Sequence, residues 1–156
     1  MKGQMVFEFI IAGLIFFTII IYSINYLNFN VSDFKNKFYQ NRLQSKAFQV
    51  SEILMAGRTN LSLTDGERFN ASKIYFFNST YCGDANYKKL AEAFYMYETA
   101  SFGTLPNDIK IELSVPSSGF LLLDCGPRMP RNTTKAEVGR MGLYEGNVAR
   151  LSVTVW

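Results

Sequence analysis

Near its start the chain has a long apolar run, which contains no charged side chain between Phe9 and Ser32. A helix of about 24 residues is roughly 36 Å long, which is enough to cross the apolar core of a bilayer. Secretory signal peptides have a shorter apolar core that is followed by small residues at a cleavage site, whereas this run ends in asparagine and aromatic residues. The pattern therefore predicts a retained membrane-spanning helix over residues 4–29.

Beyond this run, apolar residues recur at the spacing of one face of a helix, with polar residues between them. These positions are Phe34, Phe38, Leu43, Ala47, Val50 and Leu54. Gly57 stands where a glycine commonly ends a helix. We therefore predict one spine helix over residues 4–56, with an amphipathic second part over 30–57. The alternative is an anchor joined to a separate stalk helix, with the break at residues 28–30.

Residues 58–156 are predicted to form a separate head domain of helices and strands. Residues 58–72 are polar and are expected to form a loop with a turn at Asp65-Gly66, and residues 73–77 are expected to form a strand. Residues 86–98 have the apolar spacing of a helix, for which Asn86 is a candidate N-cap.

Strict alternation of apolar and polar residues predicts strands at 109–115 and 149–156, and a turn at 116–119 leads into a further strand at 120–123. These strands share one apolar face. We expect an α+β fold, in which a small, mostly antiparallel sheet packs on the amphipathic part of the long helix.

Glu8 is a single carboxylate at the start of the apolar run. A charged group in lipid costs a few kcal/mol near the bilayer centre and less near its surface, so a buried Glu8 needs a partner. Alternatively, the side chain reaches water beside an ordinary anchor.

The order Lys2-Gly3-Gln4, with Glu8 four residues after Gln4 and an apolar helix following, resembles the class III signal of archaeal type IV pilin-like proteins. This resemblance implies that a prepilin peptidase removes residues 1–3 by cleaving after Gly3, which leaves Gln4 as the new N-terminus. It also implies that Glu8 pairs with the amino terminus of another subunit during assembly, and that the fold is that of a type IV pilin. The chain departs from the family pattern at Val6 and Ala12.

The end of the chain has a second, looser resemblance to this family. Residues 143–148 and the strand after them resemble the closing hairpin of small archaeal proteins with this signal, with Gly146-Asn147 as the turn.

The chain has two cysteines and no histidine, which excludes histidine-based catalytic triads and most zinc sites. Cys82 and Cys125 are either a disulfide or two free thiols. An extracellular location favours the disulfide, whereas a cytosolic location favours the thiols.

Five N-x-S/T sequons favour an extracellular head domain. Asn30 lies too close to the anchor to be a good glycosylation site, so the candidate sites are Asn60, Asn70, Asn78 and Asn132. The positive charges that follow the span, from Lys35 to Lys46, point the other way, because an excess of basic residues usually stays cytoplasmic. Long domains can nevertheless be translocated regardless of this charge.

The remaining features exclude other classes of function. The net charge is only +3 and no basic block is present, so no nucleic-acid partner is expected. Five candidate acids of the head are scattered and form no predicted carboxylate pair, so we expect no metal, no cofactor and no enzyme activity. These acids are Asp65, Glu67, Asp84, Asp108 and Asp124.

Two functions remain. The first is a major or minor subunit of an archaeal type IV pilus-like filament, first held in the membrane and then exported to the cell surface. Its partners would be other pilin subunits, the prepilin peptidase and the assembly machinery. The alternative is a single-pass surface protein that does not polymerise and whose head binds a ligand or another protein.

Overall fold

The computed structural model describes the backbone of residues 2–98 and 105–156. Side chains are described for the same residues, apart from those of 2–6, 32, 84, 97–98 and 105–106. The chain divides into two units, residues 1–39 and residues 40–156.

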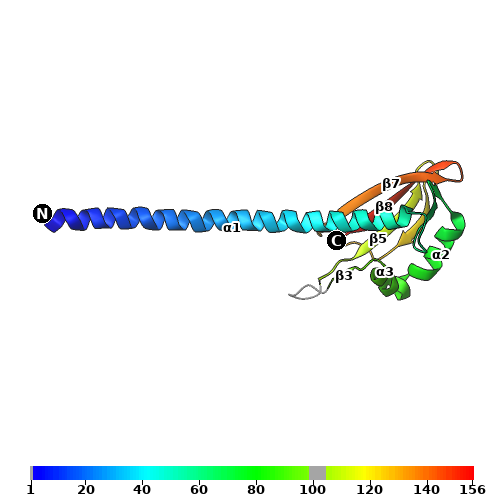
Figure 1. The fold of residues 1–156 in the computed structure, drawn as a ribbon, viewed down its shortest axis with the longest axis horizontal. Helices are drawn as coiled ribbons and strands as arrows, with labels where there is room; N and C mark the ends of the chain where they lie inside the picture. Colours follow the sequence, from blue (N-terminus) through cyan, green and yellow to red (C-terminus); the bar gives the residue numbers. More distant parts are fainter. Residues whose placement is uncertain (1, 99–104) are drawn as a thin grey trace. The chain divides into compact units, whose positions relative to one another are not determined.

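Helix α1 (Lys2–Met55) makes up the described part of the first unit and extends into the second (Figure 1). It passes through Asn28, Phe29 and Asn30 without a break, so the predicted long helix is confirmed and the alternative of a separate stalk helix is wrong. The helix ends before Gly57, which has a φ of 69° and donates its N–H to Ser62 Oγ at 2.9 Å. Glycine adopts this left-handed conformation without the strain that a side chain would add.

The second unit contains a six-stranded sheet in the order β1-β2-β7-β8-β5-β6. Its strands are β1 (Thr64–Asp65), β2 (Arg68–Phe69), β5 (Ile109–Val115), β6 (Phe120–Cys125), β7 (Ala136–Tyr144) and β8 (Asn147–Val155). All neighbours are antiparallel except β2 and β7, which pair in parallel through Arg68 and Leu143. The α+β fold with a mostly antiparallel sheet is therefore confirmed.

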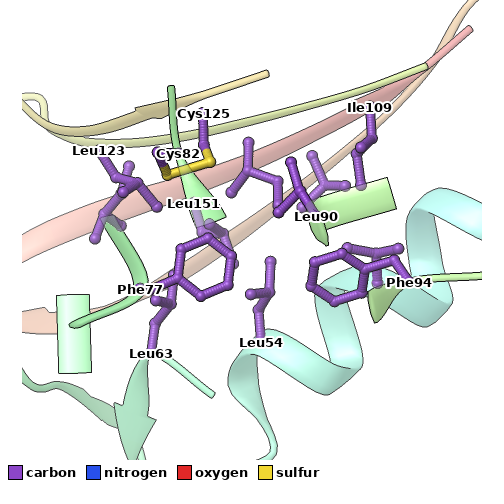
Figure 2. Packing of buried hydrophobic residues seen from close by; sticks show 14 of the residues in the cluster. Leu54, Leu63, Phe77, Cys82, Leu90, Phe94, Ile109, Leu123, Cys125 and Leu151 are labelled. Carbon is purple, nitrogen blue, oxygen red and sulfur yellow. A yellow bond between two sulfur atoms is a disulfide. The ribbon is translucent and has the colours of Figure 1, made fainter. Parts of the chain in front are cut away.

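One face of this sheet is covered by helices. Alternate residues of β5 and β8 are fully buried, as the predicted period of two requires. Figure 2 shows side chains from several elements converging on this core, among them Leu54, Phe77, Leu90 and Leu151. The contribution of α1 is one stripe of residues, Leu43, Ala47, Val50 and Leu54, each at most 2% exposed. The predicted apolar stripe thus packs in the head from Leu43 to Leu54, whereas its first two positions, Phe34 and Phe38, are exposed.

The strand predicted at 73–77 is wrong, because these residues lie in helix α2 (Ala71–Tyr81). Asn70 caps the helix by accepting the N–H groups of Ser72 and Lys73. Ile74 and Phe77 are buried three residues apart, while Tyr75 and Phe76 are exposed. The burial of these residues therefore follows the period of a helix.

The helix predicted at 86–98 is too long. A short 3-10 helix (Asp84–Asn86) leads into α3 (Tyr87–Ala93), and Asn86 makes no side-chain capping bond. The chain turns at Tyr95, whose φ is 52°, and then forms β3 (Tyr97–Glu98), which pairs with β4 (Leu105–Pro106).

Two further differences lie in the sheet. The predicted loop at 58–72 contains the β1–β2 hairpin, which turns at Gly66-Glu67.

The alternation of apolar and polar residues does not predict strand β7, because Arg140 and Gly142 occupy inward positions and hide the pattern. The hairpin after β7 turns at Glu145-Gly146, one residue before the predicted turn, and both residues have the positive φ of a type I′ turn.

Arg140 has a structural reason for facing inward. Its guanidinium pairs with Glu52, lies 3.4 Å from Ser51 Oγ and stands 4.7 Å from the centre of the Phe48 ring. The three partners belong to α1, so this side chain fastens β7 to the helix within the second unit.

Candidate functional site

The first candidate site is the apolar part of α1 in the first unit. Among the described residues, a single helix has the length and composition to span a membrane, and its most apolar 18-residue window has a mean hydropathy of 2.3. No residue of that window is buried within the chain. Phe9 and Phe29, near the two ends of the uncharged run, are 80% and 73% exposed. The side chains of this segment therefore need a cover from outside the chain, and a bilayer is one such cover.

Two hydroxyl groups inside this segment are suited to an apolar environment. The hydroxyls of Thr18 and Ser23 donate to the carbonyls of Leu14 and Ile19, four residues earlier, each at 2.8 Å. Such bonds leave no hydroxyl proton without an acceptor in lipid or in a packed helix bundle.

Glu8 differs from these hydroxyl groups because its side chain can carry a charge. It lies near the start of α1 and is exposed, and it has no ion-pair partner within the described part of the chain. Gly3 and Gln4, the predicted cleavage junction, lie on the first turn of the same helix, and their side chains are outside the described part. The chain thus supplies a carboxylate but no described cation for it, so Glu8 needs either contact with water or a partner from another molecule.

The second site is the pair of cysteines in the head. Cys82 and Cys125 form a disulfide, with their Cα atoms 4.8 Å apart, and Figure 2 shows it at the edge of the core. It joins the end of α2 to the end of β6, and Cys125 is fully buried. A disulfide of this kind is typical of an oxidising compartment, which agrees with the extracellular alternative.

The four candidate glycosylation residues lie in different surroundings. Asn60, Asn78 and Asn132 are exposed. Asn70 is partly buried and uses its side chain in the fold, because Oδ1 caps α2 while Nδ2 donates to Asp65. Attachment of glycans stays a prediction for these residues, and Asn70 is the one for which a glycan would compete with a structural role.

The same contacts act on Asp65. Hydrogen bonds from Lys73 and Asn70 hold the pKa of this carboxyl below its usual value. Folding therefore favours the ionised carboxylate, and this contribution to stability is present above the unfolded pKa and lost as the pH falls through the folded pKa. Asp65 thus has a structural role at the start of α2.

Two other head acids also have local partners. Asp124 pairs with Lys110 at 3.0 Å, and Asp108 accepts the Tyr87 hydroxyl at 2.7 Å. In residues 2–98 and 105–156, no three Asp, Glu, Cys or His side chains gather as a metal site would require. The structure therefore brings the two cysteines together but does not assemble the acids that the sequence offered.

Comparison with known proteins adds no relative. No protein-family model, no curated protein and no solved structure matches this chain.

Proposed function

We propose that the chain is a subunit of an archaeal type IV pilus-like surface filament, held in the membrane by α1 until the prepilin peptidase cleaves after Gly3. The assembly machinery then extracts it, and its apolar helix stacks against those of other subunits. The observation that carries this proposal is the uncovered apolar surface of α1, near whose start Glu8 has no ion pair with any described residue.

The extent of this surface favours packing between subunits over a simple anchor. About 20 apolar residues suffice to cross a bilayer. The exposed apolar side chains continue to Phe34 and Phe38, which are 70% and 62% exposed and stack at 6.4 Å between ring centres. They are interspersed with Asp33, Lys35 and Lys37, which places them beyond an apolar membrane core. A helix of another subunit would cover these rings, whereas a solitary anchor would leave them in water.

Glu8 has a defined role in this proposal. A carboxylate among packed apolar helices is strongly disfavoured unless it is paired. The amino terminus that cleavage creates at Gln4 of a neighbouring subunit would supply the positive charge. Because a subunit without this pairing would bury an unpaired charge, the pair would also fix how far each helix slides along the next.

The Glu8→Gln variant tests this role. We expect it to be processed and inserted normally but to form few or no filaments, because the amino terminus of the neighbour stays unpaired, at a cost of about 3 kcal/mol or more per contact. Electron microscopy of cells that produce this variant as their only copy of the chain measures the effect.

Two variants serve as controls. Glu8→Asp keeps the charge and is expected to retain part of the assembly, and Asp33→Asn removes an exposed acid elsewhere on the same unit and is expected to assemble normally. Normal filaments from Glu8→Gln would rule out the pairing of Glu8 with an amino terminus.

A further inference from the structure

The outer face of the head sheet, opposite the helices, carries a half-open cavity of about 280 Å³. Outward residues of β5, β7 and β8 form its floor, and the segment that follows β6 forms its rim. The rim contributes Arg128, Met129 and Lys135. A second cavity of about 380 Å³ shares Lys110 and Arg128 with the first, so the two form neighbouring parts of one hollow. The volume suits one or two sugar-sized units.

Gly126 allows the segment that forms this rim to pass close to β5. It has a φ of 110°, and a Cβ at this position would lie 2.1 Å from the carbonyl oxygen of Ile109. The chain leaving the Cys125 disulfide can therefore pass close against β5 only with glycine here. This close passage brings Arg128 beside Lys110 on the outer face.

The acids of this face already have partners. Glu112 and Asp124 pair with Lys110, and Glu137 pairs with Arg150. Burial lowers the pKa of Lys110, but the bonds and charges of the two acids outweigh it and raise that pKa overall, so Lys110 stays charged within its cluster. By contrast, Arg128 and Lys135 have no ion pair among the described residues.

An aromatic ring and hydroxyl groups complete the cavity. Trp156 lines it and is 6% exposed, and its indole N–H makes no hydrogen bond to a described residue. Ser152 and Thr154 lie beside it on β8, and the Ser152 hydroxyl donates to Glu137 at 2.8 Å. The combination of an indole, hydroxyls and carboxylates can contact a ring that carries several hydroxyl groups.

We propose that this cavity binds an acidic sugar, with the guanidinium of Arg128 and the ammonium of Lys135 holding the sugar carboxylate. The sugar ring lies against the indole of Trp156, and its hydroxyls donate to the carboxylates of the sheet face. Arginine recognises a carboxylate through two parallel bonds, which gives preference over a neutral sugar of the same shape. This inference is independent of polymerisation, because every residue of the cavity belongs to the head of one chain.

The single tryptophan of the chain makes the test direct, because its fluorescence reports this cavity. The full chain in detergent is titrated with methyl β-glucuronoside, methyl β-glucoside and sodium acetate at constant ionic strength. We expect a saturable change with the glucuronoside in the millimolar range, and weaker binding of the other two probes. In the variant carrying Arg128→Ala and Lys135→Ala, affinity for the glucuronoside should fall by at least about fivefold.

Lys89→Ala is the control for charge, since Lys89 is exposed on α3 and does not line the cavity, and its titration should match the unaltered chain. Unchanged fluorescence of the unliganded double variant shows that its fold is intact. Equal binding of glucuronoside and glucoside, equal binding of acetate, no saturable response, or a double variant with unchanged affinity would each overturn the proposal.

Discussion

The Gly126→Ala variant is expected to lose about 3 kcal/mol or more of folding free energy, which is a large fraction of the stability of a typical domain. Alanine is strained at a φ of 110°, and its Cβ would meet the Ile109 carbonyl oxygen at 2.1 Å. The clash is with the backbone at the start of β5, so it cannot be relieved by moving a side chain aside. Denaturant titration of the full chain in detergent, followed by Trp156 fluorescence, measures the loss.

Gly119→Ala provides the matched control. Gly119 also has a positive φ, 69°, but a Cβ there would have nothing within 4 Å. The Gly119→Ala variant should therefore lose only about 1 kcal/mol of folding free energy, which is the cost of placing a side chain in the left-handed conformation. Equal losses in the two variants would contradict the close approach of the segment after β6 to β5.

Removal of the disulfide by Cys82→Ala and Cys125→Ala together is expected to destabilise the head by about 4 kcal/mol, given the separation of 43 residues. The unfolded chain gains the freedom of this loop, while alanine leaves no polar group in the buried site of Cys125. The same denaturant titration measures the change.

The unaltered chain treated with a reductant serves as the comparison, because it should approach the denaturation midpoint of the double variant. A double variant as stable as the oxidised chain would show that the disulfide does not constrain the head.

The sequence predicted those elements whose periodicity is unambiguous. The long helix, β5 and β8 each bury one regular set of apolar positions, such as Leu43 to Leu54 on α1, and these sets meet in one core. The prediction failed at 73–77, because a short apolar run fits a strand or a helix equally well and only the Asn70 cap decides between them. It failed at β7 because Arg140 points inward to partners on α1 that are distant in sequence.

Of the candidate sites, too, one could be predicted from the sequence and another could not. The sequence showed that a disulfide could join only Cys82 and Cys125, because no other cysteine is present, but it left open whether the bond forms. The cavity on the outer face could not be predicted, since Gly126, Arg128 and Trp156 come together only through the passage of the chain across β5. The sequence does contain a glycine directly after Cys125. Only the structure shows that this position has a positive φ, which glycine adopts without strain.

The N-terminal residue of the native chain tests the central claim most directly. Mass spectrometry of the chain purified from the membranes and surface filaments of its own cells reads this residue without any assumption about assembly. Our account predicts a chain that begins at Gln4, with Glu8 as its fifth residue. A mature chain that still carries Met1, Lys2 and Gly3 would contradict processing by a prepilin peptidase and, with it, the proposed filament subunit.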